Sequence, residues 1–190
     1  MTNRWGPYCL RRVDPYLDYI AKWRPALTVV HECKQEKVDY VKNASPETKV
    51  IGRLYHDDSW YNDRIMENPE GAAQTIHDEL MSSDWARNVD WCLTSNEVCQ
   101  TWDKLDNLNR YYVHLQSLAG NNYKIALFSF SVENPGWSDS DPDGWEASMM
   151  KHWEKVYPAM RKGVQRGDIL SLHQYNNPRL LQLDTHRDSD

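Results

Sequence analysis

Long apolar runs and an excess of positive charge are both missing from this 190-residue chain. Apolar stretches such as residues 126–128 and 29–30 fall far short of the ~20 residues that cross a membrane. Residues 1–6 contain no apolar stretch typical of a signal peptide, so the sequence indicates a cytoplasmic location or leaves the location unknown. The 22 Lys and Arg residues against 28 Asp and Glu residues give a net charge of −6, which argues against a nucleic-acid partner.

Closely spaced cysteine pairs are absent as well, and phenylalanine is scarce. The chain has four cysteines but no C-x-x-C pair, so the sequence predicts free thiols, no zinc or other metal site and no cofactor. Only 2 Phe residues stand beside 9 Trp and 11 Tyr residues. Trp and Tyr combine an apolar ring with a polar group, which suits wet clefts and sugar faces, although we expect most of these rings to fill the core.

Short apolar segments alternate with longer amphipathic ones along the chain. The alternation predicts six strands, at residues 7–10, 26–31, 49–55, 91–94, 124–130 and 169–173. Helices are predicted between the strands, at residues 14–23, 35–42, 68–80, 102–115 and 145–164. Residues 57–61 are predicted to form a loop.

This order of strands and helices, without hairpins, predicts one α/β domain over residues 1–190, with a parallel sheet covered by helices. Two architectures fit, an open doubly wound sheet and a (β/α)8 TIM barrel. No Gly-rich phosphate turn follows the first strand, whereas polar residues follow several strands, as on the active-site rim of a barrel. Because a barrel usually takes ~250 residues, we expect an incomplete TIM-barrel-like fold of about six βα units.

The strand ends carry the candidate functional residues. Glu97 follows Asn96 at the end of the fourth strand, where a carboxyl group can donate a proton to a substrate or simply stabilise a helix N-terminus. Arg53, at the end of the third strand, can hold a carboxylate or a substrate hydroxyl, or form an ion pair in the barrel interior. His173 and Tyr175 end the sixth strand and share one side of it, as site residues or as a packed core pair.

Four motifs in sequence order resemble the clan-A (β/α)8 glycoside hydrolases, and more narrowly the uncharacterised cellulase-like members of that superfamily. They are Gly6-Pro7-Tyr8, Ile51-Gly52-Arg53, Asn96-Glu97-Val98 and Leu172-His173-Gln174-Tyr175, and together they span nearly the whole chain. In that superfamily the fourth-strand Glu of an Asn-Glu pair is the general acid/base, and a Glu at the end of strand seven is the nucleophile. The resemblance therefore implies that Glu97 is an acid/base residue.

The chain departs from the family pattern at three motif positions. Val98 stands where the family has Pro, Gln174 where it has Glu, and Tyr8 where it has His. Strands seven and eight, and with them the nucleophile, are not among the six strands counted. Glu133 is the nearest spare carboxylate, and we expect it to cap a loop rather than to act as nucleophile.

The resemblance implies a glycoside-hydrolase-like protein that acts on O-glycosidic bonds of an oligo- or polysaccharide, and is inactive by itself because the nucleophile is missing. Asn96 would bind a sugar hydroxyl, His173 and Tyr175 would orient the sugar or nucleophile, and Trp60 and Trp137 would stack on pyranose faces. Two alternatives stay open: a non-catalytic carbohydrate-binding or interaction module, and an unrelated open-sheet α/β enzyme. We expect no nucleic-acid or membrane partner, whereas open sheet edges favour self-association.

Overall fold

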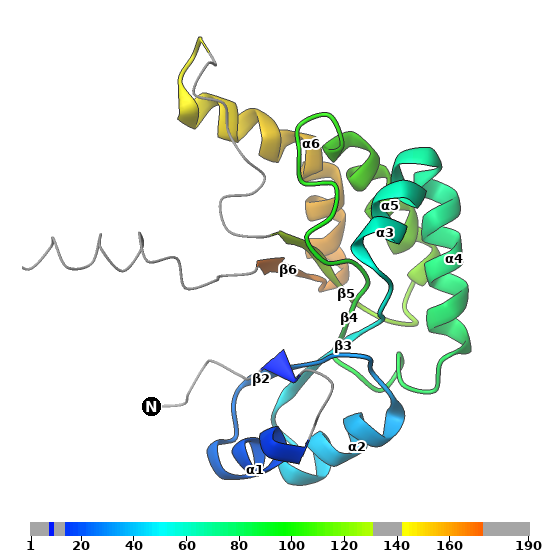
Figure 1. Cartoon of the computed structure of the whole chain (residues 1–190), viewed down its shortest axis with the longest axis vertical. Helices are drawn as coiled ribbons and strands as arrows, with labels where there is room; N and C mark the ends of the chain where they lie inside the picture. The colour runs from blue at the N-terminus through cyan, green and yellow to red at the C-terminus, as the bar shows by residue number, and fades with distance from the viewer. Residues whose placement is uncertain (1–7, 10–13, 131–141, 173–190) are drawn as a thin grey trace, which may run out of the picture.

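The computed structural model describes residues 8–9, 14–130 and 142–172, which form one parallel sheet with helices along its outer side (Figure 1). The strands are β1 (Tyr8–Cys9), β2 (Leu27–Val30), β3 (Lys49–Arg53), β4 (Trp91–Leu93), β5 (Ile125–Phe130) and β6 (Ile169–Leu172). The helices are α1 (Asp14–Trp23), α2 (Gln35–Ala44), α3 (Asp58–Glu67), α4 (Pro69–Ser82), α5 (Leu105–Ala119) and α6 (Trp145–Arg166).

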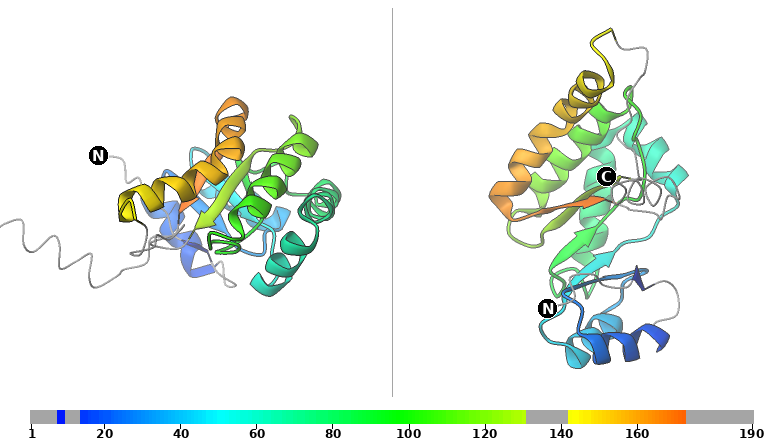
Figure 2. Two further views of the ribbon diagram at one scale, coloured as in Figure 1. Left: turned by 90° about the horizontal axis from the view of Figure 1, so that it is seen from above. Right: turned by 90° about the vertical axis from the view of Figure 1, so that its left-hand side faces the viewer.

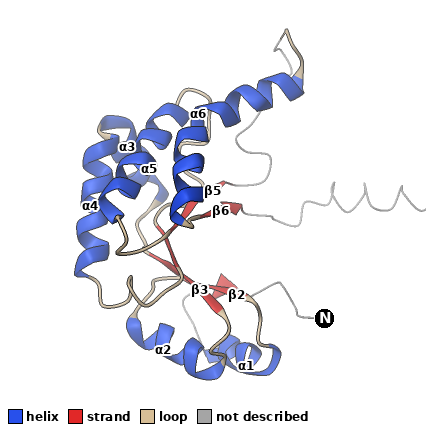
Figure 3. Cartoon of the chain, turned by 180° about the vertical axis from the view of Figure 1, so that it is seen from behind, coloured by secondary structure: helices blue, strands red, loops and turns tan. Residues whose placement is uncertain are grey.

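The strands lie side by side in the order in which they occur in the sequence, and every neighbouring pair is parallel. β1 contributes only two residues, so β2 to β6 form the body of the sheet. This sheet curls into a half-barrel, with the strands inside and the helices outside (Figures 2 and 3). A doubly wound sheet would reverse its strand order at a switch point, and the described strands show no such reversal.

Both faces of the sheet are apolar, as expected for parallel strands. The outer face packs against the helices and holds the main core, in which Tyr111 and Tyr112 of α5 meet Phe128 and Phe130 of β5. The inner, concave face carries a smaller cluster of Ile51, Leu93 and Ala126, with partly buried neighbours at Leu27, Val29, Trp91 and Ile169. Many of the described aromatic rings lie in the core or pack against it, whereas five are exposed: Tyr19, Trp23, Tyr40, Tyr55 and Trp102.

The sequence pattern predicted nearly all of these elements to within a few residues, but the predicted loop at residues 57–61 is wrong. Helix α3 begins at Asp58. Its polar first residues resemble a loop, yet Tyr61 and Ile65, four residues apart, are buried on one face and hold the segment against the core. An acidic residue in the first turn also interacts favourably with the positive end of the helix dipole.

The number of βα units is smaller than expected among the described residues. Two helices, α3 and α4, follow β3, and β6 is the last described element, so five strand–helix units and a sixth strand are present. Leu170 and Leu172 of β6 are 40% and 48% exposed. They pair in register with the buried Leu127 and Phe130 of β5, so they lie on the face that helices cover elsewhere in the sheet.

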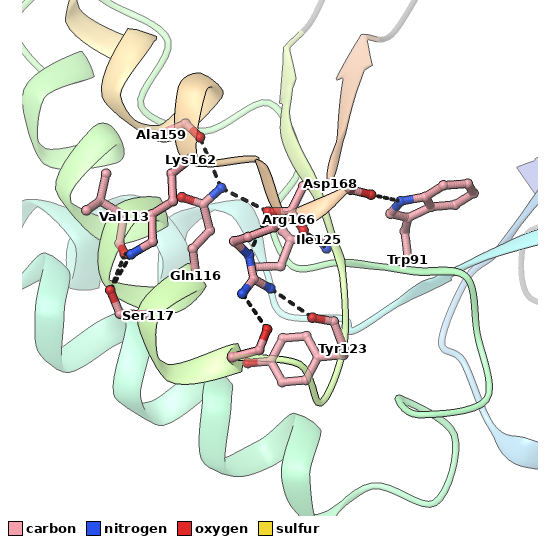
Figure 4. Close-up of polar contacts among 12 residues, drawn as sticks. Trp91, Val113, Gln116, Ser117, Tyr123, Ile125, Ala159, Lys162, Arg166 and Asp168 are labelled. Carbon is pink, nitrogen blue, oxygen red and sulfur yellow. Dashed lines mark hydrogen bonds and ion pairs between the residues drawn. The ribbon is translucent and has the colours of Figure 1, made fainter. Parts of the chain in front are cut away.

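A buried carboxylate ties the last two strands together at the N-terminal end of the sheet (Figure 4). Asp168, directly before β6, accepts hydrogen bonds from the Ile125 backbone N–H at 2.9 Å, from Gln116 Nε2 at 2.9 Å and from Arg166 Nε at 3.1 Å. Its side chain is fully buried. Arg166 in turn donates to the Tyr123 carbonyl at 2.9 Å, so the network joins α5, α6, β5 and β6.

A second aspartate repeats this arrangement two strands earlier. Asp90, directly before β4, accepts from the Val50 backbone N–H of β3 at 2.9 Å and from the Lys42 and Lys49 ammonium groups, both at 2.9 Å. In both places a carboxylate at the start of one strand bonds a backbone N–H of the preceding strand. The N-terminal end of the sheet is therefore fixed by charged groups that already have partners.

Candidate functional site

Glu97 lies in the segment that follows β4, at the C-terminal end of the sheet. Its backbone N–H donates to the Ser129 carbonyl of β5 at 3.1 Å, and its own carbonyl accepts from Gln100 Nε2 at 2.7 Å. The residue is half-buried and has a φ of 52°, in the left-handed region that side chains with a Cβ rarely adopt. The surrounding chain therefore holds Glu97 at the rim in one defined backbone position.

Three of the predicted site residues act on a carboxylate that the sequence did not single out, one by a hydrogen bond and two by their charges. The Asn96 side chain hydrogen-bonds the carboxylate of Asp58, in the first turn of α3. The charges of Arg53 and Glu97 also act on that carboxylate. Asp58 thus contacts Asn96 and lies within electrostatic range of Arg53 and Glu97.

Arg53 belongs to the concave side of the sheet. It lies two residues after Ile51 of β3, which faces the inner apolar cluster, and alternate residues of a strand share a face. Its guanidinium lies 5.7 Å from the centroid of the Tyr55 ring, and the Tyr55 ring lies 5.0 Å from that of His31. Arg53 is only 7% exposed, whereas Tyr55 is 40% exposed and donates its hydroxyl to Asp57 at 3.0 Å.

The electrostatics of Asp58 differ from those of the carboxylates at the other end of the sheet. Asp58 is exposed, but partial desolvation by its neighbours raises the pKa of its carboxyl group, and the negative charge of Glu97 raises it further. The Arg53 charge and the Asn96 hydrogen bond oppose this rise and do not cancel it. Asp58 therefore holds a proton more readily than an ordinary aspartate does.

A buried hydroxyl lies behind this group of residues. Tyr61 of α3 is 1% exposed, and its hydroxyl has no hydrogen-bond partner among the described residues. Burial raises the pKa of Tyr61, and the charges of Arg53 and Asp58 act on the same hydroxyl, so it lies close to the rim cluster. A buried hydroxyl without a hydrogen bond lowers the stability of the folded state. The Tyr61 hydroxyl can therefore donate a hydrogen bond to a further acceptor within range of the Asp58 charge.

Backbone strain collects at the same end of the sheet. Positive φ angles occur at Glu32 after β2, at Glu97 and Cys99 after β4, and at Phe128 and Ser129, where the pairing of β5 with β6 is irregular. Non-glycine residues adopt such angles at a cost of about 1–3 kcal/mol each, and they cluster at functional sites. The strain supports a functional role for the rim.

Trp60 is the one predicted sugar-stacking residue within the described ranges, and it packs against protein. Its ring stacks on that of His56 with centroids 4.1 Å apart and planes inclined by 13°. His56 also contacts Glu79, with Nε2 and Oε2 2.7 Å apart, and Arg64 lies 6.0 Å from the Trp60 ring. The more exposed aromatic ring beside Arg53 is that of Tyr55.

Three other predicted site residues, His173, Tyr175 and Trp137, lie outside the described residues, and so does Glu133. Asp58 is the residue that sequence reasoning missed, because it was assigned to a loop. Its position shortly after the third strand was the signal that could have found it, since loops after strands build the rim of such sheets. Tyr55, at the end of the same predicted strand as Arg53, was not assigned to the site either.

Metal-binding groups of three or more His, Cys, Asp or Glu side chains do not occur within residues 8–9, 14–130 and 142–172. Cys33, Cys92 and Cys99 are buried free thiols, and burial raises the pKa of the Cys33 thiol to about 12 and that of Cys99 to about 11. These thiols stay protonated at neutral pH and belong to the packing. Among the helices described, none combines the length and apolarity needed to cross a membrane.

Comparison with known proteins adds no relative. No protein-family model matches the chain, and neither a curated protein nor a solved structure matches it.

Proposed function

We propose that this chain is part of a (β/α)8 barrel of the glycoside hydrolase type, with a carbohydrate site at the rim around Glu97. The observation that supports this most directly is that Asp58 is hydrogen-bonded by Asn96 and influenced by the charges of Arg53 and Glu97, at the C-terminal end of a sequentially ordered parallel sheet. In barrels of this topology the active site lies at that end. The four motifs that resemble the clan-A superfamily add independent support.

The residue types at the rim match the chemistry of a sugar. A sugar presents many hydroxyl groups that both donate and accept hydrogen bonds, and the Asn96 amide and the two carboxylates offer complementary groups. Glu97 protonates the glycosidic oxygen of the leaving sugar in this proposal, and the half-exposed ring of Tyr55 provides an apolar face for a pyranose.

The nucleophile of a covalent glycosyl-enzyme intermediate is not identified among the described residues. Retaining hydrolysis needs a nucleophilic carboxylate, which the family resemblance places on a seventh strand, and the described residues include six strands. The same count of six described strands favours a second candidate function, a non-catalytic carbohydrate-binding module. A module of this kind would bind sugars through the same rim residues without turnover.

Ligand binding by the purified chain tests the proposed site. We expect cellopentaose, mannopentaose or xylopentaose to bind in isothermal titration calorimetry, and Asn96→Ala to weaken that binding by about tenfold, the equivalent of one hydrogen bond of about 1.4 kcal/mol. Asp63→Asn, an exposed aspartate of the same helix as Asp58, is the control and should leave binding unchanged. Absence of binding to all three sugars, or equal binding by Asn96→Ala, contradicts the proposal.

A further inference from the structure

We propose that the rim site prefers a positively charged sugar, an amino sugar, and that Tyr55, Asp57 and Asp58 are the residues that recognise it. This inference rests on the proposed function, because it names the substrate class of the same carbohydrate site. The argument depends on the contacts and exposure of these three residues and on how charge is distributed along the chain.

The three residues lie at the start of helix α3, just beyond the C-terminal end of β3. Strand β3 ends at Arg53 and α3 begins at Asp58, so a short connection joins them. The Tyr55 hydroxyl donates to the Asp57 carboxylate at 3.0 Å, and the Tyr55 ring lies 5.7 Å from the Arg53 guanidinium. Tyr55 and the two carboxylates therefore belong to the rim on which the carbohydrate site is proposed.

The Tyr55 ring is both accessible and held in place. It is 40% exposed, whereas the Arg53 and His31 side chains that lie against it are buried. Contacts with these two residues and the hydroxyl bond to Asp57 fix the orientation of the ring. An exposed aromatic ring of this kind packs on the apolar face of a pyranose and also attracts a cation.

The two carboxylates beside this ring lack a cationic partner at the surface. Asp57 and Asp58 are exposed, and neither forms a salt bridge with another described residue. Glu70 of α4, in contrast, contacts the Arg110 guanidinium at 2.9 Å. Because Arg53 is almost wholly buried, a ligand that approaches Tyr55 meets the carboxylates rather than the guanidinium.

The net charge of the chain is concentrated in the same region. Residues 57–84, which include α3 and α4, contain eight Asp and Glu residues and one Arg, so the rest of the chain is nearly neutral. A surface region of one sign raises the local concentration of ligands of the opposite sign. The field around the start of α3 therefore favours a cationic ligand over a neutral one.

A buried hydroxyl close to Asp58 provides a further donor for the same ligand. Tyr61 follows Asp58 by three residues in α3, so the two side chains are neighbours on the helix. Helical side chains lean toward the N-terminus, which favours a position of the Tyr61 ring over the first turn. Tyr61 is 1% exposed, and its hydroxyl has no hydrogen-bond partner among the described residues. A sugar hydroxyl supplies the acceptor that this donor needs.

An amino sugar has a group for each of these features. Glucosamine offers an apolar face to the Tyr55 ring, an ammonium group to the carboxylates and hydroxyl groups to the remaining donors and acceptors. A hydrogen bond between an ammonium group and a carboxylate is about twice as strong as one between neutral groups. A glucose unit can use the ring and the hydroxyl contacts but lacks the charge, so it binds more weakly.

Two matched oligosaccharides test this preference. Cellopentaose and the β-1,4-linked pentamer of glucosamine share one backbone and differ in the group on the second carbon, a hydroxyl in one and an ammonium in the other. At low salt and slightly below neutral pH, the full chain should bind the glucosamine pentamer about tenfold more tightly in isothermal titration calorimetry. Added salt should reduce this preference, because it screens the charges.

Variants that remove one charge locate the preference on the rim. Asp57→Asn and Asp58→Asn should each weaken binding of the glucosamine pentamer by about tenfold, and that of cellopentaose by no more than about twofold. Asp63→Asn removes the same charge from an exposed position of the same helix and should change neither affinity. Thermal melting checks that each variant is folded. Equal losses in all three variants would contradict a specific role of Asp57 and Asp58.

The outcomes separate the inference from the site on which it rests. Equal affinity for the two pentamers overturns the preference for an amino sugar and leaves the carbohydrate site standing. Absence of binding to either pentamer overturns both. Spermine, a polyamine without a sugar ring, should bind about tenfold more weakly than the glucosamine pentamer, because it has no apolar ring face for Tyr55. Spermine binding of equal strength refutes the inference, since it shows a surface that attracts any cation.

Discussion

At the N-terminal end of the strands, Asp90 and Asp168 are each surrounded by donors, including a backbone N–H of the preceding strand. At the C-terminal end, the charge of Glu97 acts on Asp58, the buried Tyr61 hydroxyl is unpaired among the described residues, and several backbone angles are strained. Both ends are formed by the same strands and both carry carboxylates. The difference is that donors outweigh burial at Asp90, whereas burial and the Glu97 charge outweigh the Arg53 charge and the Asn96 hydrogen bond at Asp58.

This contrast separates stability from function in physical terms. Satisfied carboxylates favour the folded state, because their hydrogen bonds are lost on unfolding. Carboxylates with raised pKa and residues with positive φ reduce stability, and proteins tolerate them where they serve a site. Substitutions at the two ends should therefore have opposite consequences for folding.

The largest effect is expected at Asp168. Asp168→Asn removes the charge from a fully buried side chain and leaves Arg166 and the Ile125 N–H with a weaker partner. Breaking a buried ion pair in this way should lower the free energy of unfolding by about 3–5 kcal/mol, as measured by urea denaturation. Asp143→Asn, which breaks the exposed contact with Lys151, is the control and should cost no more than about 1 kcal/mol. Equal effects of the two would show that the buried network does not stabilise the sheet.

Asp90→Asn should give a smaller loss with a defined pH dependence. Burial opposes ionisation of Asp90, but the hydrogen bonds from Lys49, Val50 and Lys42 outweigh it and hold its pKa below the usual value. The ionised carboxylate therefore stabilises the folded chain above about pH 3.9, its usual value in an unfolded chain, and this stabilisation disappears as the pH falls through the lowered pKa. We expect a loss of about 1.5–3 kcal/mol at pH 7, from urea denaturation, that shrinks in acid. A loss of equal size at pH 2 would contradict the assignment.

Asp58→Asn should behave in the opposite way. Because the pKa of Asp58 is raised, ionisation of this group opposes folding, and the stability present in acid is lost as the pH rises through that pKa. Asn keeps the size of the side chain and removes the charge, so the variant should be as stable as the parent chain or up to about 0.5 kcal/mol more stable at pH 7. Thermal melting at pH 7 and at pH 3 measures the difference, which should vanish at pH 3. Marked destabilisation at pH 7 would place Asp58 with the structural carboxylates.

The side edge of the sheet should affect association more than folding. Leu170 and Leu172 are exposed on the face of β6 that helices cover elsewhere in the sheet. Because β6 is also the edge strand among the described residues, it favours pairing between copies of the chain. Leu170→Lys with Leu172→Lys should reduce self-association in sedimentation velocity while changing the free energy of unfolding by no more than about 0.5 kcal/mol per site. A parent chain that sediments as a monomer at all concentrations contradicts this expectation.

Local pattern by itself determined most of the secondary structure. Helix α1 begins at Asp14 and ends at Trp23, as its Pro and apolar spacing predict, and the buried strands β2 to β5 coincide with short apolar runs. Helix α3 was missed because its first residues are polar and its burial depends on distant partners in the core. The spacing of apolar residues and the capping residues are local properties, so they can be predicted from the sequence. The burial of Tyr61, in contrast, is decided by the helices around it.

The site divides in the same way. Strand ends followed by polar residues predicted that Arg53, Asn96 and Glu97 lie on one rim, because parallel strands bring their C-terminal ends to one edge. The sequence also contained Gly52, but only the structure gives its reason: a Cβ there would lie 2.5 Å from the Trp85 ring. The hydrogen bond between Asn96 and Asp58, the stacking of Trp60 on His56 and the opposite pKa shifts of Asp58 and Asp90 were decided by tertiary structure alone. Each depends on distances between residues that are far apart in the sequence, and such distances are fixed only when the sheet curls and the helices pack against it.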